Sequence, residues 1–197
     1  MKQKHITLFF VGLNFLALNH ACLANENHLL TGVWSSKCAS DGTGNFNIET
    51  FKFSGNSANY SINTYRDSAC KKPISSLKTY RDFKLGAKVN GLPHTRKLDY
   101  VFNNVTMTYT DSSVIKEANI SPGYYGFTQW KLNQPHDVSG QKRTPSSSPE
   151  HSKGEKFYTI VKIDNDKLYM GDYSSGSGAS DKTRLSAIYN VPFIKHN

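Results

Sequence analysis

The side chains best suited to catalysis or metal binding are the histidines, and their spacing predicts neither. After residue 24, each histidine falls in an expected loop or terminus: His28, His94, His136, His151 and His196. No two of them stand two apart on a strand or four apart on a helix, the spacings that a metal site favours. We expect no metal ion, and the one grouping that could assemble a catalytic site is His136 and Asp137 with His151.

Nucleophile and nucleotide-binding motifs are not found either. Serine is plentiful, yet Gly176-Ser177-Gly178 lies in a polar stretch rather than in the strand-to-helix turn of a nucleophile elbow. No glycine pattern of the P-loop or dinucleotide-binding type follows an expected strand. The sequence therefore favours a non-catalytic protein without a cofactor.

Aromatic residues offer a different chemistry, the binding of an apolar ligand. The chain holds 11 Tyr and 11 Phe, and many recur with the period of two that places side chains on one face of a strand. Such residues usually fill a core, but an apolar wall with hydroxyl groups also suits a small amphipathic molecule. The candidate lining residues are Tyr60, Tyr80, Tyr100, Phe102, Met107 and Trp130.

Alternating hydrophobicity in short runs, separated by Gly, Asn, Asp and Ser, predicts an all-β fold. Three tight hairpins are expected, because a two-residue turn lets the apolar residues on both sides share one face. The turns and nearest pairs are Gly55-Asn56 with Phe53 opposite Ala58, Asn103-Asn104 with Phe102 opposite Val105, and Asn165-Asp166 with Ile163 opposite Leu168. At Asn103-Asn104, a β-bulge within one strand is the alternative, and a further bulge is expected near Thr50, where the apolar phase changes.

Other strands are expected over 31–37, 77–85, 126–132 and 184–194, with one short helix near 111–120 that Asp111 or Ser112 caps. The segment 133–156 is rich in Pro, Ser and charge and holds few apolar residues, so it predicts a long mobile loop. The expected fold is a single domain, residues 25–197, in which an antiparallel meander forms a barrel or half barrel.

Residues 1–24 have the three parts of a secretory signal peptide. Lys2 and Lys4 precede an apolar run over 6–18, and a polar end leads to Ala24 at the cleavage site. The apolar run is too short to span a bilayer. A lipoprotein acylated on Cys22 is the alternative, and export to a bacterial periplasm or out of the cell is expected.

Cysteine usage agrees with export. After residue 24 the chain has two cysteines, Cys38 and Cys70, and an even pair in an exported chain predicts a disulfide. Closing a loop of about 32 residues should stabilise the fold by roughly 3–4 kcal/mol.

The charge is basic but dispersed. Lys and Arg number 24 and Asp and Glu 15, a formal net charge of +9, which falls to +7 without the two lysines of residues 1–24. Because the basic residues are spread along the chain, no nucleic-acid surface is expected. The densest group, Lys142 and Arg143, lies in the 133–156 loop. An exported basic protein would meet the anionic surface of the cell envelope, which is a possible partner. We expect the protein to be a monomer.

The segment Thr31-Gly32-Val33-Trp34-Ser35-Ser36-Lys37-Cys38 resembles the lipocalin signature, a Gly-x-Trp at the start of the first strand. Together with Tyr65-Arg66-Asp67-Ser68-Ala69-Cys70, it is similar to the secreted, lipocalin-like APCDD-type modules. The resemblance implies a β-barrel in which Trp34 plugs the closed end and Arg184 packs across it. It also implies a small apolar or amphipathic ligand in the barrel mouth, and no reaction.

Two functions follow as hypotheses. The first is an exported, non-catalytic binding protein for a small hydrophobic or amphipathic, lipid-like ligand. The alternative is a secreted or envelope interaction protein, such as an inhibitor, accessory or effector, that acts through the basic loop 133–156.

Overall fold

The computed structural model describes residues 26–120 and 122–196, so the expected signal peptide and Cys22 lie outside the described residues. The strands are β1 (Gly32–Ser35), β2 (Ala39–Ser40), β3 (Phe46–Ser54), β4 (Ser57–Tyr65), β5 (Pro73–Lys88), β6 (Thr95–Tyr109), β7 (His136–Asp137), β8 (Lys156–Asp164), β9 (Lys167–Met170) and β10 (Phe193–His196). The α-helix is α1 (Ser112–Ala118), and short 3-10 helices are η1 (Glu26–Leu30), η2 (Tyr124–Gly126), η3 (Tyr173–Ser175) and η4 (Asp181–Thr183). No helix in these two ranges is long and apolar enough to cross a membrane.

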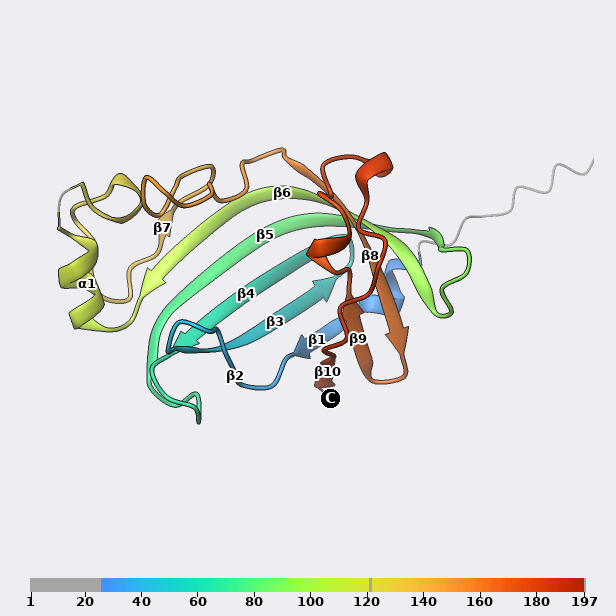
Figure 1. Ribbon diagram of the computed structural model, residues 1–197, viewed down its shortest axis with the longest axis horizontal. Coiled ribbons are helices and arrows are strands. Elements are labelled where there is room, and N and C mark those ends of the chain that lie inside the picture. The colour runs from blue at the N-terminus through green and yellow to red at the C-terminus, as the bar shows by residue number, and fades with distance from the viewer. Residues whose placement is uncertain (1–25, 121, 197) are drawn as a thin grey trace, which may run out of the picture.

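Eight of these strands close into an antiparallel barrel, which confirms the predicted fold class. The order around the wall is β1, β10, β9, β8, β6, β5, β4 and β3, and β3 pairs again with β1. Figure 1 shows β3 to β6 as a strongly curved sheet, with β8, β9 and β10 completing the wall. The barrel is therefore closed rather than half open.

Two of the three predicted hairpins are confirmed. β3 and β4 turn at Gly55-Asn56, and β8 and β9 turn at Asn165-Asp166, with the apolar residues paired as expected. The bulge predicted near Thr50 is wrong, because β3 and β4 pair without a register shift. The apolar residues before Thr50 instead face outward, where they are half-buried.

The hairpin predicted at Asn103-Asn104 is wrong, and the alternative, a β-bulge, forms. Tyr80 of β5 pairs with Asn104 whereas Arg81 pairs with Phe102, so Asn103 is the extra residue in an uninterrupted β6. The long β5 pairs with β6 on both sides of the bulge, which a turn would not allow. The extra residue shifts the alternation of inward and outward side chains by one position. Phe102 and Val105 therefore both face inward, and each is 1% exposed.

Two predicted strands, 126–132 and 184–194, are also wrong. Their backbone N–H and C=O groups form hydrogen bonds with partners other than a neighbouring strand of the expected kind. In 126–132, the Asn119 side chain accepts a hydrogen bond from Trp130 N at 2.7 Å and donates to Trp130 O at 3.2 Å. In 184–194, only the last residues join the sheet, as β10. The preceding residues bond to the end of β9 and to the chain just after it, for example from Tyr189 N to Met170 O at 2.9 Å.

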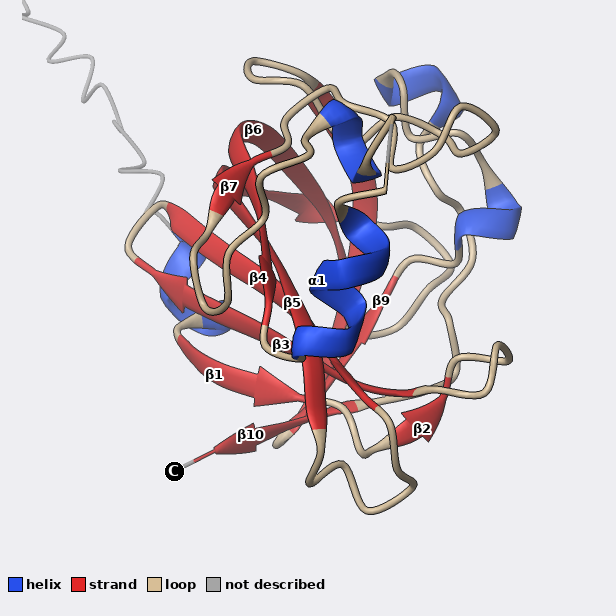
Figure 2. Cartoon of the chain, turned by 90° about the vertical axis from the view of Figure 1, so that its left-hand side faces the viewer, coloured by secondary structure: helices blue, strands red, loops and turns tan. Residues whose placement is uncertain are grey.

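The interior holds two hydrophobic clusters. The larger fills the barrel, and the second lies under α1 at the far end of β5 and β6. Figure 2 shows α1 lying across that end. The predicted helix is confirmed, and Asp111 caps it by accepting a hydrogen bond from Ser113 N at 2.8 Å. The second cluster contains Val105, Met107, Tyr109, Ala118, Tyr125, Trp130 and Val138.

The segment 133–156, predicted as a long mobile loop, contacts the rest of the fold at several points. Its short strand β7 pairs with β6, and Val138 is fully buried. His151 stacks on Phe102 with ring centroids 3.7 Å apart, and Tyr125 donates its hydroxyl to Glu150 at 2.9 Å. The segment therefore forms part of the wall around the second cluster.

The predicted Cys38–Cys70 disulfide is confirmed, with a Cα–Cα distance of 6.0 Å. It ties the chain after β1 to the connection between β4 and β5. A disulfide of this kind is consistent with an oxidising, exported environment.

Candidate functional site

One end of the barrel is closed by the chain that enters β1. Trp34 is 1% exposed and donates Nε1 to Leu30 O at 2.8 Å. Asn27 of η1 is buried and accepts a hydrogen bond from Leu85 N at 2.9 Å, which fastens η1 across this end. Gly32 adopts a φ of +128°, where a side chain would be strained, and an added Cβ would lie 3.0 Å from the Lys195 side chain. The residues of the Gly-x-Trp pattern therefore sit where the chain closes the barrel.

Arg184 does not lie across Trp34 as expected. Lys195 takes that position, with Nζ 5.1 Å from the Trp34 ring. Arg184 stands over Tyr158 at 5.3 Å and pairs with Asp99 at 2.6 Å. Because the chain before β10 does not form the expected strand, Arg184 is held outside the wall and fastens that segment to β6 and β8.

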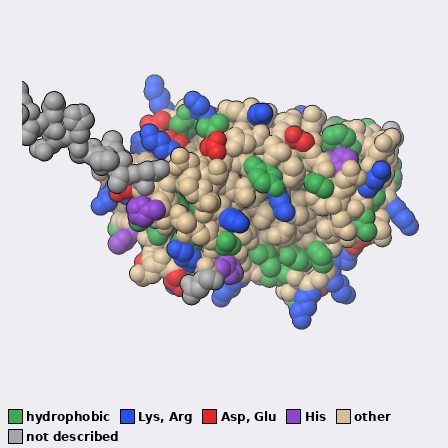
Figure 3. Space-filling model, turned by 180° about the vertical axis from the view of Figure 1, so that it is seen from behind, with side chains coloured by type: hydrophobic (Ala, Val, Ile, Leu, Met, Phe, Trp, Pro, Cys, Tyr) green, Lys and Arg blue, Asp and Glu red, His purple; other side chains and the backbone are tan. Residues whose placement is uncertain are grey.

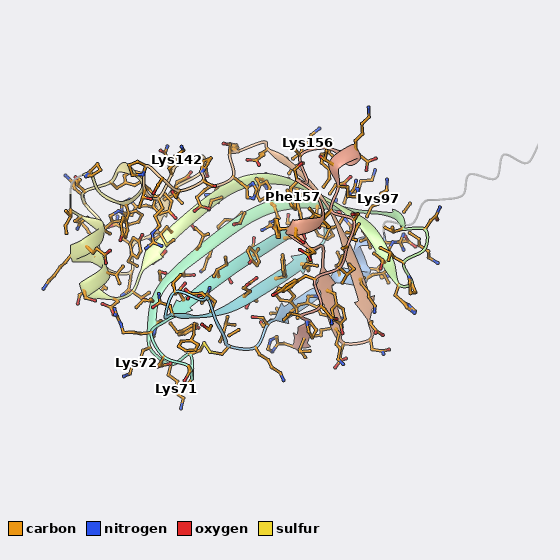
Figure 4. All side chains as sticks on the ribbon, in the orientation of Figure 1. Lys71, Lys72, Lys97, Lys142, Lys156 and Phe157 are labelled. Carbon is orange, nitrogen blue, oxygen red and sulfur yellow. A yellow bond between two sulfur atoms is a disulfide. The ribbon has the colours of Figure 1, made fainter. Side chains whose placement is uncertain are left out.

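Toward the opposite end the barrel contains an open cavity of about 640 Å³. Its deeper walls come from β3, β4, β5, β6 and β8, and the chain around β2 and the segments that precede η3 and β10 form the mouth. Figure 4 shows Phe157 at the start of β8, beside the segment that follows β9. The interior residues include Glu49, Phe51, Tyr60, Arg81, Tyr100 and Phe157, and Tyr173, Tyr189 and Val191 lie at the mouth.

The structure divides the six predicted lining residues among four places. Tyr60 and Tyr100 line the cavity, Phe102 lies in the adjoining core, Met107 and Trp130 belong to the second cluster, and Tyr80 is 37% exposed on the outer face. Tyr80 faces outward because the odd-numbered residues of β5 face inward. Met107 and Trp130 lie beyond the Asn103 bulge, where α1 covers the interior.

Arg81 is the cavity residue that the sequence analysis missed. It is 6% exposed, and its guanidinium carbon lies within cation–π distance of four rings. The distances to the ring centroids are 4.5 Å for Tyr100, 5.0 Å for Phe102, 5.2 Å for Tyr60 and 5.8 Å for Phe51. The alternation along β5 could have identified it, because Arg81, Phe83 and Leu85 are all odd-numbered and therefore face the same side of the strand.

The Arg81 charge has no ionic partner among residues 26–120 and 122–196. None of the ion pairs there involves Arg81, and its buried Nε has no hydrogen-bond acceptor. The hydroxyl of Tyr100 is likewise buried without a partner in that part of the chain. A buried, unpaired ion costs several kcal/mol, and a cation–π contact offsets about 0.5–2 kcal/mol of it. The fold thus keeps unsatisfied donors at the cavity wall.

A carboxylate, Glu49, faces the same cavity, where it is hydrogen-bonded to Tyr60 and forms no ion pair with Arg81. It accepts a hydrogen bond from the Tyr60 hydroxyl at 2.5 Å. Burial and then the Glu49 charge raise the pKa of Tyr60 well above its ordinary value, and burial raises the pKa of Tyr100. Both phenols are therefore neutral hydrogen-bond donors at neutral pH.

The three residues considered for catalysis each have separate partners. His136 packs on Trp130 with ring centroids 4.5 Å apart, and Asp137 accepts a hydrogen bond from Ser139 Oγ at 2.6 Å. His151, which stacks on Phe102, lies 2.7 Å from Glu155. Across the described ranges, no three His, Cys, Asp or Glu side chains group as metal ligands would.

Basic side chains are dispersed over the surface. Figure 3 shows Lys and Arg scattered around one face without a single dense patch. Figure 4 places Lys71 and Lys72 at the tip of the β4–β5 connection, Lys142 near the α1 end, and Lys97 and Lys156 near β8. On the face shown in Figure 3, the described basic side chains form no continuous track.

No protein-family model matches this chain, and no curated protein matches it in sequence. The cavity is therefore the feature of this chain that bears on its function.

Proposed function

We propose that the protein is an exported, non-catalytic binding protein for a small amphipathic, lipid-like ligand that occupies the barrel interior. The observation that carries this proposal is the cavity of about 640 Å³, open at one end and walled mainly by aromatic and aliphatic side chains. Ligand sites commonly have this size and a few polar groups among apolar walls. An eight-stranded barrel is also wide enough to hold one small molecule.

Two further features support the proposal. Gly32 and Trp34 occupy the closed end of the barrel, which supports the proposed relationship to lipocalin-like modules. The Cys38–Cys70 bond supports export, because disulfides persist in oxidising compartments.

A neutral apolar dye tests the proposal, because its fluorescence rises when it enters a dry cavity. N-phenylnaphthylamine is titrated into the mature protein and into two variants that carry the same substitution. Val191 lines the mouth and is 46% exposed, whereas Val101 lies on the outer face of β6 and is 37% exposed. Val191→Trp should weaken dye binding at least tenfold, and Val101→Trp should leave it unchanged. Equal binding by all three proteins would place the dye elsewhere and reject the proposal.

The alternative, an interaction protein that acts through 133–156, stays a prediction. Because Val138 and His151 pack into the fold, deleting the segment would damage the structure itself. The sharper test replaces the exposed Lys142 and Lys153 by Glu and measures partner capture and dye binding in parallel.

A further inference from the structure

We infer that the ligand carries a single carboxylate, which Arg81 and Tyr100 bind inside the cavity, so that the ligand class is a long-chain monocarboxylic acid. This inference rests on the proposed function and specifies the ligand of that same site.

The cavity wall carries two hydrogen-bond donors without partners. Arg81 Nε and the Tyr100 hydroxyl are both buried with no hydrogen-bond partner in the described ranges, and both residues line the cavity. Buried polar groups in native proteins are normally paired, so two unpaired groups at one cavity wall indicate a missing partner. Neither a guanidinium nor this phenol, which lies against the guanidinium, needs another donor. The missing partner is an acceptor, and the Arg81 charge favours an anion.

Arg81 is held rigidly. Its strand position faces Phe102 directly beside the Asn103 bulge, and four rings surround the guanidinium at 4.5 to 5.8 Å. These rings restrict the side chain, yet none of them can accept the in-plane hydrogen bonds that a guanidinium makes best. A carboxylate matches that planar arrangement with two oxygens.

The charges of the site limit the charge of the ligand. Arg81 is the buried cation of the cavity, and Glu49 lines the same cavity with its carboxylate held by Tyr60. The other charged lining residues are Lys37, which is exposed, and Asp41 and Asp172, which are half-buried. One buried cation balances one negative charge, and the Glu49 charge would oppose a second. The arrangement therefore favours a monoanion such as a carboxylate over a doubly charged phosphate.

The rest of the ligand has an apolar surface available to it. Phe51, Phe157, Met170 and Phe193 line the cavity and present no charge. The exposed Tyr189 and Val191 continue this apolar surface to the mouth. A chain of methylene groups can follow this surface outward from a head group at Arg81, which makes the ligand amphipathic.

The test compares dodecanoic acid, dodecanol and dodecyl phosphate as probes by isothermal titration calorimetry on the mature protein, stripped of bound lipid. We expect dodecanoic acid to bind about ten- to a hundredfold more tightly than dodecanol, the factor typical of a hydrogen-bonded ionic contact. Dodecyl phosphate should bind more weakly than the acid.

Matched variants test which residues cause the acid to bind more tightly than the alcohol. Arg81→Met should remove the preference for the acid while dodecanol binding is retained, and Tyr100→Phe should reduce acid binding several-fold. The controls are Arg66→Met, which removes the same charge from an exposed side chain outside the cavity, and Tyr80→Phe, which removes a hydroxyl from the outer face of β5. Both should leave the preference unchanged.

The outcomes separate the two proposals. Equal binding of the acid and the alcohol, or an acid preference that survives Arg81→Met, overturns this inference and leaves the apolar cavity in place. Tighter binding of the phosphate overturns the choice of a carboxylate. Failure of all three probes to bind rejects the proposed function as well. If Arg81→Met does not fold, the comparison of the three probes on the unaltered protein and on Tyr100→Phe still decides.

Discussion

Removing the Cys38–Cys70 bond provides a quantitative test of how the barrel mouth is stabilised. The bond closes a loop with a sequence separation of 32 residues that contains all of β3 and β4. The chain-entropy relation gives about 3.7 kcal/mol for a loop of this length at room temperature. For a domain of this size, each kcal/mol shifts the melting temperature by about 2–4 °C, so the expected loss is about 7–15 °C.

The double variant Cys38→Ser/Cys70→Ser is compared with the oxidised protein by urea unfolding, followed by circular dichroism and by tryptophan fluorescence. Coincident transitions are required before a free energy of unfolding is assigned. The oxidised protein in reductant serves as a second reduced sample, since it should match the double variant. A difference below about 1 kcal/mol would refute the reasoning, because the unfolded chain would then be little constrained by the bond.

Three further predictions concern the core, the helix cap and the cavity carboxylate. Leu168→Ala, at a fully buried position of β9, should lower the free energy of unfolding by about 2–5 kcal/mol in urea titrations. A loss under 1 kcal/mol would contradict its place in the core. Hydrogen bonds from Ser113 lower the pKa of Asp111 below its ordinary 3.8, so its stabilising effect is present at neutral pH and disappears as the pH falls through the lowered value. Melting temperatures of Asp111→Ala and the unaltered protein should therefore differ at neutral pH and converge in strong acid, and a constant difference would count against the cap. Glu49→Gln removes one of the charges that raise the pKa of Tyr60, so tyrosinate absorbance should show that pKa falling while burial keeps it above 10.0. The same variant should bind dodecanoic acid more tightly, and weaker binding would show that Glu49 supports the anion.

Local sequence predicted the strands where a tight turn fixes the register. Gly55-Asn56 and Asn165-Asp166 are such turns, and both hairpins formed with the expected pairs. At Asn103-Asn104 a turn and a bulge place the same side chains on one face, so the local pattern could not separate them. The decision comes from β5, which is long enough to pair on both sides of the bulge.

The strand predicted around Trp130 does not form, for a reason that the local sequence does not contain. The segment around Trp130 has a strand-like composition, but the Asn119 side chain supplies the hydrogen bonds that a neighbouring strand would have made. A contact between a helix end and a distant loop leaves no periodic signal in the sequence.

The candidate site was only partly predictable. Tyr60 and Tyr100 were identified because alternation placed them beside apolar partners, and both line the cavity. Arg81 obeys the same alternation, but the pattern does not predict it as a lining residue, since a charged residue on an inward face contradicts the usual apolar pattern. Such local conflicts are expected at functional sites. The role given to Arg184 came from family resemblance and failed because its segment does not form the expected strand.

A crystal structure of the protein with an ω-brominated dodecanoic acid would show where both ends of the ligand lie. Carboxylate density is expected within hydrogen-bond distance of the Arg81 guanidinium and the Tyr100 hydroxyl, with the anomalous signal of bromine between Phe193 and the mouth. Bromine located only beside Trp130 under α1, or on the outer surface of the barrel, would contradict this expectation.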